Sequence, residues 1–407
     1  MAFERNQRNS RQRPGRAKWG IIAAAAVVII GGLTAAGWFL GWFGSPEPGG
    51  DTGETTPVTV PPADTVIHFV AGGDLNVTDK AVASGVSAGG YDYSDVLLDV
   101  VSILSGGDLT ALNFEGSLSG EPYGTDSKSA PQQLMADLKS AGVDLIQTAN
   151  SKTLTNGLRG LTATIRGIRE TGMQNLGTFT DSEEYERYQG YLIREVKGIR
   201  VAIVAFTKGM DGSGLPACGE KCVNLLYKDY TSTYQKVDTE GITAVLQAVA
   251  KESPDVTIAM LHWGSEFNDQ ISNTQKKIIK LMQEQGVDAI IGTHPHYVQQ
   301  MGFDEETGIF VAYSLGDFLG DAEKAGTDYS VLLDLEITKN GKTGETKITG
   351  YGYTPIYQYE SEEGLRLLRI REAMTAYESS YIDSVSEEVY AAMKSALSRI
   401  EARVSAN

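Results

Sequence analysis

The sequence predicts a layered α/β domain that follows one N-terminal membrane span. From Thr65 onward, short runs typical of buried strands alternate with helical stretches, an order that favours sheets covered by helices. The stretch from Trp19 to Phe43 has no charged residue and exceeds the roughly 20 apolar residues that cross a membrane core. Polar residues able to bind metal follow several of the predicted strands, which indicates one shared site.

The N-terminal residues predict how the chain meets the membrane. Residues 1–18 carry five arginines and one lysine against a single glutamate, a net charge of +5, and residues 19–43 form the predicted transmembrane helix. Because a basic flank stays in the cytoplasm, we expect a single-pass protein of the cell membrane with an extracytoplasmic main domain. The small residues Ala35–Gly37 leave a cleaved secretory signal as the alternative, which also exports the main domain.

Composition and charge restrict the partners. Residues 44–63 are rich in proline, glycine and threonine, so we expect a linker there. The whole chain has a net charge of −17, and without the +5 of residues 1–18 the remainder carries about −22. This field repels nucleic acid, which we exclude as a partner. An acidic polymer can bind only at a local basic or metal-bearing patch.

Cys218 and Cys222 are the only cysteines, spaced C-x3-C in a loop-like run. In an exported protein, a pair this close predicts a local disulfide. A zinc ribbon would need a second pair. A redox-active pair is the alternative, although no neighbouring residue obviously lowers a thiol pKa.

Apolar runs and glycines define the predicted elements. The predicted strands are 66–70, 109–112, 143–146, 201–206, 256–261, 289–291 and 309–313. The predicted helices are 131–140, 157–170 and 274–285, ended by Gly142, Gly172 and Gly286 in the left-handed conformation. We expect the main domain over 64–350 and a C-terminal extension over 351–407 that ends in a helix. Its apolar stripe is interpreted as packing surface: Val385, Val389, Ala392, Met393, Ala396 and Ile400.

Side chains able to bind metal follow four predicted strands. They are Asp74, Asn113 with Glu115, His262, and His294 with His296. Ligands bind beyond the carboxyl ends of strands in open α/β sheets, so we expect these groups to converge. Two carboxylates and three imidazoles suit manganese, iron or zinc, and a bridging carboxylate would hold two divalent ions close together. Such a centre can supply hydroxide to a phosphoryl or acyl group.

Each of these side chains also has a structural alternative. A single histidine is more often a hydrogen-bonded structural residue than a ligand. Asp74 could cap a turn, and Glu115 could accept hydrogen bonds from nearby backbone amides. The repetition of the pattern at several strand ends favours the metal site.

Five motifs resemble those of the CapA family, poly-γ-glutamate capsule biosynthesis proteins with a calcineurin-like metallophosphoesterase fold. They are Gly73-Asp74, Asn113-Phe114-Glu115-Gly116, His262-Trp263-Gly264-Ser265-Glu266, Gly292-Thr293-His294-Pro295-His296 and Tyr313-Ser314-Leu315-Gly316-Asp317-Phe318. The resemblance covers about residues 65–320 and implies a layered α/β/β/α sandwich. It implies that Asp74, Glu115 and His296 hold one ion, and that Glu115, His262 and His294 hold the other.

The chain departs from the family pattern at three places. The family usually has an Asn-Asn-His-like segment after the third strand, whereas Asn150 is followed here by Ser151 and Lys152. The segment Leu75–Asp79 replaces one that ends in an arginine, and Gly316-Asp317 stands where the family has Gly-Asn. These changes weaken the expectation of full hydrolytic activity.

The resemblance implies biosynthesis, export or anchoring of an anionic envelope polymer, poly-γ-glutamate or a related one, with membrane synthase subunits as possible partners. For a hydrolase we expect His262 and Lys152 to be catalytic. Asn113, Asn150 and Lys152 would contact substrate, with Lys152 holding an anion. One alternative is a degenerate scaffold of the same fold that binds without chemistry. The other is an extracellular metallophosphoesterase that acts on nucleotides or lipids.

Overall fold

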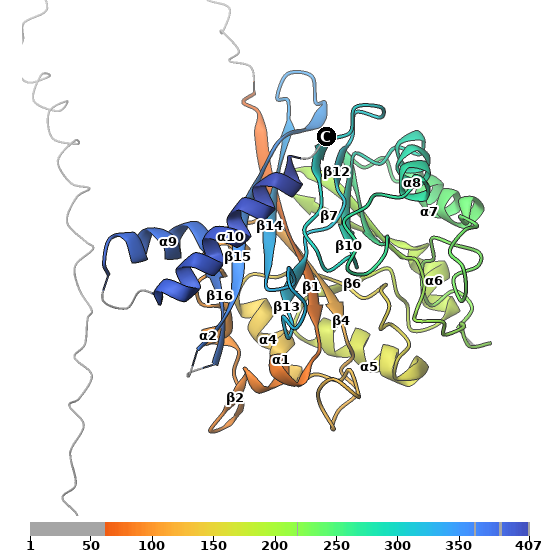
Figure 1. Cartoon of the computed structure of the whole chain (residues 1–407). Coiled ribbons are helices and arrows are strands. Elements are labelled where there is room, and N and C mark those ends of the chain that lie inside the picture. Colours follow the sequence, from red (N-terminus) through yellow and green to blue (C-terminus); the bar gives the residue numbers. More distant parts are fainter. Residues whose placement is uncertain (1–61, 218, 362–363, 382–384, 406–407) are drawn as a thin grey trace, which may run out of the picture. The chain divides into compact units, whose positions relative to one another are not determined.

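The computed structural model of the chain describes residues 62–217, 219–361, 364–381 and 385–405 (Figure 1). The predicted basic segment, membrane span and nearly all of the linker lie outside these ranges, as does Cys218. Within the described ranges, every helix is too short or too polar to cross a membrane. The membrane span and the disulfide between Cys218 and Cys222 therefore stay predictions.

The larger sheet has the strand order β16-β15-β14-β1-β4-β5-β6, and β13 pairs with the end of β1. Its strands are β1 (Thr65–Asn76), β4 (Leu109–Glu115), β5 (Leu145–Gln147), β6 (Gln174–Leu176), β13 (Asp317–Leu319), β14 (Tyr329–Lys339), β15 (Thr346–Ser361) and β16 (Gly364–Arg369). β1, β4, β5 and β6 run parallel, whereas β14, β15 and β16 extend the sheet in antiparallel fashion. The carboxyl ends of β1 and β4 are therefore neighbours.

The smaller sheet has the order β11-β12-β10-β9-β8-β7. Its strands are β7 (Tyr191–Val196), β8 (Ile199–Thr207), β9 (Val256–His262), β10 (Ala289–Thr293), β11 (Met301–Phe303) and β12 (Phe310–Ala312). β8, β9, β10 and β12 run parallel, and the edge strands β7 and β11 are antiparallel. A separate hairpin joins β2 (Val86–Ser87) and β3 (Gly90–Tyr91).

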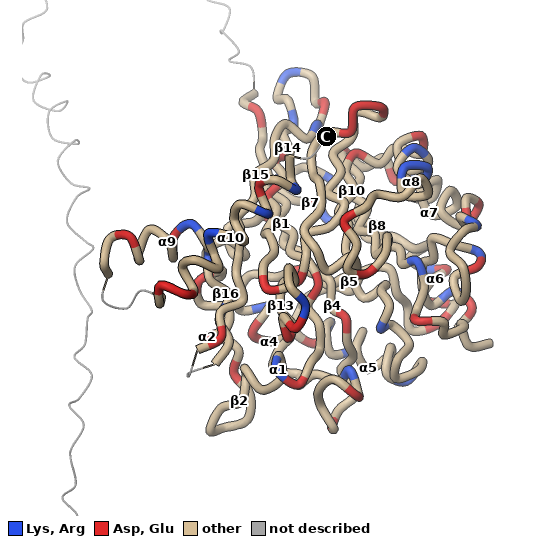
Figure 2. The backbone as a smooth tube through the Cα atoms, viewed as in Figure 1, with Lys and Arg blue, Asp and Glu red and all other residues tan. Residues whose placement is uncertain are grey.

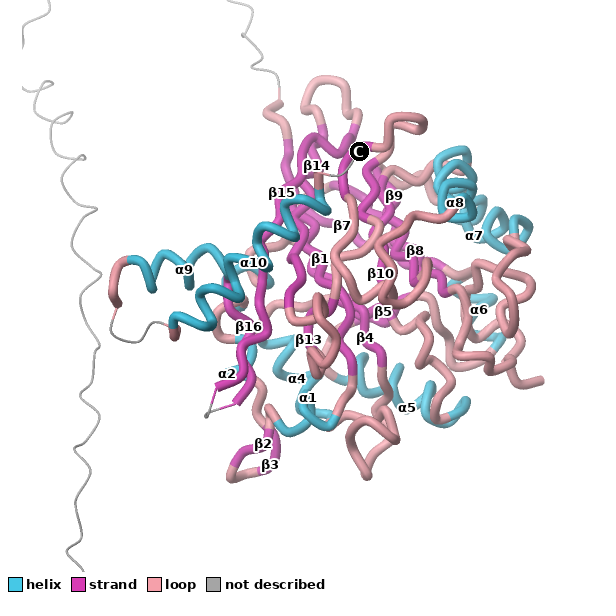
Figure 3. Tube along the Cα trace, viewed as in Figure 1, coloured by secondary structure: helices cyan, strands magenta, loops and turns pink. Residues whose placement is uncertain are grey.

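The two sheets share one apolar core, and helices cover their outer faces (Figures 1 and 3). The helices are α1 (Asp79–Ala83), α2 (Ser94–Leu97), α3 (Val101–Leu104), α4 (Gln132–Ser140), α5 (Gly157–Glu170), α6 (Ser182–Tyr188), α7 (Thr239–Lys251), α8 (Asn273–Glu284), α9 (Ile370–Glu378) and α10 (Glu387–Val404). Residues of α1 to α4 pack on the larger sheet, and α7 and α8 pack on the smaller one. The layers run helix, sheet, sheet, helix, which confirms the predicted α/β class.

The structure confirms the predicted strands as β1, β4, β5, β8, β9, β10 and β12, and the predicted helices as α4, α5 and α8. Gly142, Gly172 and Gly286 have φ angles of 107°, 88° and 87°, as their place after a helix predicts. The predicted boundary between residues 350 and 351 falls inside β15, because that strand pairs with β14 on both sides of it. The predicted apolar stripe, apart from Ala392, packs into the core between the sheets, so the described residues after 350 belong to the same compact unit as the main domain.

Two glycines allow strands of this fold to approach closely beside the predicted site. A Cβ on Gly73 would lie 1.8 Å from the carbonyl oxygen of Gly316, next to the 2.9 Å hydrogen bond that the Asp74 amide donates to that oxygen. A Cβ on Gly292 would lie 2.0 Å from the carbonyl oxygen of Tyr313. Because no side chain fits at either position, both glycines are needed for this approach.

We expect Gly73→Ala to destabilise the fold by about 1–3 kcal/mol or more, because β13 must move away to admit the methyl group. Gly352→Ala is the matched control, since Gly352 also lies in a strand and its Cβ would have no neighbour within 4 Å. Urea unfolding followed by circular dichroism measures both free energies of unfolding. Equal stability of the two variants would contradict the close approach.

Candidate metal centre

The structure brings the five predicted metal ligands together in the interior. Asp74 is in β1, Glu115 and His262 are the last residues of β4 and β9, and His294 and His296 follow β10. The sequence placed Asp74, Asn113 and Glu115 after their strands, but β1 and β4 extend further than their apolar runs and include them. Exposed fractions are 0% for Asp74 and His262, 2% for Glu115, 3% for His294 and 7% for His296.

Three overlapping sets of side chains have ligand atoms that all lie within 4.8 Å of one another. The sets are Glu115 with His294 and His296, Asp74 with Glu115 and His262, and Asp74 with His296 and Asp317. Glu115 and Asp74 each belong to two sets, so a carboxylate lies where it could bridge two ions.

Left-handed backbone directs the two histidines of the loop after β10. His294 has a φ of 95° and His296 a φ of 59°, values that residues with a side chain rarely adopt. The amide of His294 donates a hydrogen bond of 3.0 Å to Asp74 Oδ2, which ties this loop to β1. Such strain persists only where the surroundings hold it, and it is typical of functional sites.

Ser151 lies between two imidazoles. Its hydroxyl is 3.0 Å from His262 Nε2 and 3.4 Å from His294 Nδ1, and the two rings are 4.5 Å apart at their centroids. The other nitrogen of His262, Nδ1, is 3.0 Å from the hydroxyl of Thr293. The serine that replaces the family's second asparagine therefore contacts two predicted ligands directly.

Asp317 joins the cluster, although it was not among the predicted ligands. Its Oδ1 is 2.7 Å from His296 Nδ1 and accepts a hydrogen bond of 2.9 Å from Asn76 Nδ2. The ring of Phe267 stacks on His296 with a centroid distance of 5.1 Å. The substitution of aspartate for the family's asparagine is the signal that could have identified this residue.

Burial dominates the electrostatics of the cluster. It raises the pKa of Asp74, and together with the Asp74 charge it raises the pKa of Glu115 to about 8. Burial and the neighbouring cations lower the pKa of His262 and His294. Burial also disfavours the charged form of His296, but the Asp317 carboxylate outweighs it and raises the pKa of His296 to about 10.

These residues fit a divalent cation. Glu115 Oε1 is buried, accepts no hydrogen bond from any described residue and lies 3.7 Å from His262 Nε2. A buried carboxylate oxygen without a partner costs free energy that a cation would offset. Carboxylate oxygens and imidazole nitrogens together suit manganese, iron or zinc.

The predicted substrate contacts Asn113 and Asn150 are buried beneath the cluster, each 0% exposed. Asn113 Nδ2 donates a hydrogen bond of 2.6 Å to Asp74 Oδ1, and Asn150 Nδ2 donates one of 2.7 Å to the Phe114 carbonyl. The Asn113 amide therefore holds the predicted ligand Asp74, and the Asn150 amide holds β4. The sequence had predicted that both would contact substrate. Lys152 Nζ is paired with Asp211, so its positive charge is already partnered.

A cavity of about 250 Å³ opens beside His294. Its walls are Ser151, Lys208, Gly209, Asp211, Tyr234, Ser265, Glu266 and His294. Lys208 Nζ is 3.3 Å from His294 Nε2 and donates a hydrogen bond of 2.7 Å to the Gly264 carbonyl. Lys208 directly follows β8 and was not among the site residues predicted from the sequence. The strand-end rule that found the histidines could have found it.

Comparison of the sequence with known families identifies the class of protein. The chain belongs to the family of the bacterial capsule synthesis protein PGA_cap, whose sequence model matches residues 68–322. This confirms the predicted CapA resemblance. The chain is 26% identical over 261 residues to the PGA biosynthesis protein CapA of Bacillus subtilis (strain 168), a match that covers 61% of this chain.

It is also 27% identical over 276 residues to the capsule biosynthesis protein CapA of Bacillus anthracis, which covers 66% of this chain. The match spans 63% of the length of each of these curated relatives. Among solved structures, the calcineurin-like phosphoesterase YfkN from Bacillus subtilis is similar with a TM-score of 0.42 and 17% identity, over 72% of this chain and 90% of that one.

We expect metal binding to release protons and to weaken as the pH falls. In the metal-free protein, Glu115 with a pKa of about 8 is mostly protonated at pH 7, and His296 with a pKa of about 10 is charged. A ligand must give up its proton to bind a cation, so affinity rises with pH up to these values. Titration calorimetry with Mn²⁺ in buffers of different ionisation enthalpy counts the protons. An affinity independent of pH between 6 and 9 would contradict this reasoning.

Proposed function

We propose that this protein takes part in the biosynthesis, export or anchoring of capsular poly-γ-glutamate or a related anionic envelope polymer. We further propose that it engages the polymer at a divalent metal centre held by Asp74, Glu115, His262, His294 and His296. The observation that carries the proposal is this buried cluster, with an unpartnered Glu115 oxygen, at the wall of an open cavity. Family membership and the printed names of the two relatives support the polymer.

Charge explains why an anionic polymer would bind at this site. The chain carries a net charge of −17, so its surface at large repels a polyanion. Lys208 lies at the cavity beside His294, and burial lowers its pKa. A carboxylate or phosphoryl oxygen that entered the cavity would meet this ammonium group and the metal centre together.

The chain's own residues would prepare such a site for chemistry. A bound divalent cation would supply a water of lowered pKa and would polarise an ester or amide group. Asp317 holds one ring nitrogen of His296 and so fixes the orientation of the other. Lys208 would orient the anionic group. His262 has both nitrogens beside hydroxyl groups in the interior, so a ligand role suits it better than proton transfer.

The proposed location follows from the N-terminal residues. Residues 19–43 would span the cell membrane once, with residues 1–18 in the cytoplasm and the described domain outside. Membrane synthase subunits are the proposed partners in this arrangement.

A scaffold of the same fold that binds without chemistry is the second candidate. Two observations favour it. The Ser151 hydroxyl lies between His262 and His294, and Lys152, which replaces the family's histidine, is paired with Asp211. Neither residue supplies an imidazole for proton transfer.

We expect Glu115→Ala and His294→Ala to lower the metal content of the purified protein at least about tenfold, because each removes a ligand. His68→Ala is the matched control, since His68 pairs with Asp334 at 2.9 Å near the start of β1. Mass spectrometry of manganese, iron and zinc gives the content. A wild-type protein without any of these metals, or a His294→Ala variant that keeps them, would contradict the metal centre.

The same variants separate the candidate functions. Turnover of polyglutamyl substrates that is lost in Glu115→Ala supports a hydrolase of the polymer. Turnover confined to nucleotide or lipid phosphoesters indicates the extracellular metallophosphoesterase. Polymer binding with no turnover in a metal-loaded protein leaves the scaffold.

A further inference from the structure

A groove runs along the outer face of α5. One hollow of about 790 Å³ is lined by Ser119, Asn156 and the first half of α5, and another of about 390 Å³ is lined by the second half and Thr180. Thr162 and Arg166 line both hollows, so the hollows adjoin along the helix. Small residues of the helix form the floor of the first hollow, among them Gly160 and Ala163.

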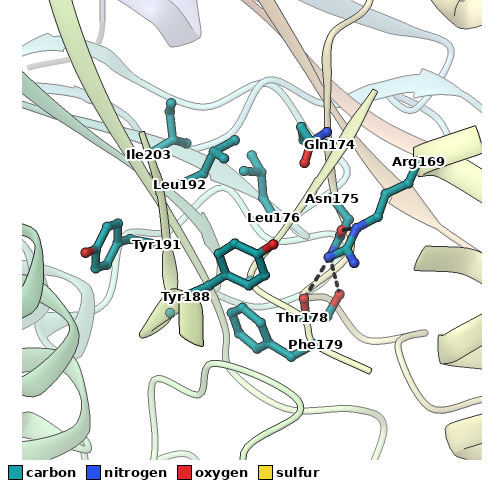
Figure 4. Close-up of a pocket in the computed structure, with 12 residues that line it drawn as sticks. Arg169, Gln174, Asn175, Leu176, Thr178, Phe179, Tyr188, Tyr191, Leu192 and Ile203 are labelled. Carbon is teal, nitrogen blue, oxygen red and sulfur yellow. Dashed lines mark hydrogen bonds between the residues drawn. The ribbon is translucent and has the colours of Figure 1, made fainter. Parts of the chain in front are cut away.

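Two arginines of this groove have no partner in the described part of the chain. Arg159 and Arg166 are exposed, and neither makes an ion pair or hydrogen bond with a described residue. Their separation of seven residues places them on one face of the helix, about 10 Å apart along its axis. Arg169 differs, because it pairs with Glu184 and its Nε donates a hydrogen bond of 2.8 Å to Asn175, beside which it lies in Figure 4.

Unpartnered arginines are informative in a chain with 52 acidic and 35 basic residues. Figure 2 shows Lys and Arg positions on α5, and both acidic and basic positions over the rest of the described chain. Glu170 is the acidic residue among those that line the groove, and it lies at the opposite end of the groove from Asn156. The two free guanidinium groups therefore form a local cationic strip on a protein whose net charge is −17.

The groove begins next to the metal centre. Asn156 Nδ2 and Ser119 Oγ donate hydrogen bonds of 2.7 and 2.9 Å to Ser117 Oγ, and Ser117 lies two residues after Glu115. The segment between β5 and α5 carries Ser151 at the cavity and Asn156 at the groove. The cavity and the groove therefore border the same segment of the chain.

We infer that the α5 groove binds a carboxylate-bearing polymer chain through Arg159 and Arg166, and so extends the site of the proposed function on which this inference rests. Guanidinium groups bind carboxylates with two parallel hydrogen bonds, a geometry that ammonium groups lack. A polymer with a carboxylate on every unit can reach both arginines at once. Poly-γ-glutamate has this chemistry, and its charge is complementary to the strip.

The test uses the full-length protein and a fluorescently labelled poly-γ-glutamate fragment of defined length. In the variant Arg159→Gln with Arg166→Gln, both charges are lost, and glutamine is a good helix former. The control is Lys394→Gln with Arg399→Gln, which removes the same charge from exposed positions of α10. Fluorescence anisotropy at low salt and at about 0.5 M NaCl measures affinity, and manganese content is measured alongside.

We expect the α5 variant to bind the fragment about tenfold more weakly, with a smaller loss of affinity on raising the salt, because exposed charge pairs are screened. The control should bind like the wild type, and both variants should keep their manganese. Unchanged affinity of the α5 variant, an equal loss in the control, or no binding by the wild type would overturn the inference. A wild type that binds the fragment as expected but holds no manganese would instead count against the proposed metal centre.

Discussion

The structure depends on the burial of three carboxylates in one place. Asp74, Glu115 and Asp317 are almost inaccessible to water, and each charge raises the cost of ionising the others. The protein offsets much of this cost with neighbouring groups: the amide of His294 and the Asn113 side chain for Asp74, and His296 and Asn76 for Asp317. Glu115 Oε1 is buried and has no hydrogen-bond partner among the described residues.

Several features of the fold serve this arrangement. Gly73 and Gly292 let β1 and β10 approach the backbone of residues 313–316. The left-handed backbone at His294 and His296 turns the loop after β10 toward Asp74. The sheets pack face to face, so the ends of β1 and β4 from one sheet meet the ends of β9 and β10 from the other. Because the ligands come from both sheets, the site forms only when the two sheets are packed against each other in this position.

The residues that depart from the family pattern form contacts of their own. Asp317 adds a carboxylate and is paired with His296, so its extra charge is compensated locally. Ser151 contacts His262 and His294, and the ammonium group of Lys152 is paired with Asp211 at the edge of the cavity. These substitutions preserve a packed, charge-balanced centre while they remove an imidazole. This combination is why binding and hydrolysis have to be measured separately.

Apolar runs predicted the buried parallel strands because those strands are covered on both faces, and the strand-end rule then grouped Asp74 with the histidines. The same reasoning missed β14, β15 and β16. The first residues of β15 alternate between half-buried and exposed positions, and only Pro355, Ile356 and Gln358 of the strand are buried. The strand also contains many tyrosines and threonines, so it has no apolar run. The boundary at residue 350 followed from that omission. Lys208 was missed because the strand-end rule was applied only to residue types that bind metal, which exclude lysine. Asp317 was missed because the change from asparagine to aspartate was interpreted only as a departure from the family pattern.

The most direct test of the metal centre is anomalous diffraction at the manganese edge from crystals of the protein soaked in Mn²⁺. We predict one or two strong peaks within coordination distance of Glu115, surrounded by Asp74, His262, His294 and His296. The absence of a peak there, or peaks only at acidic surface residues, would contradict the central claim that these buried side chains bind a divalent cation.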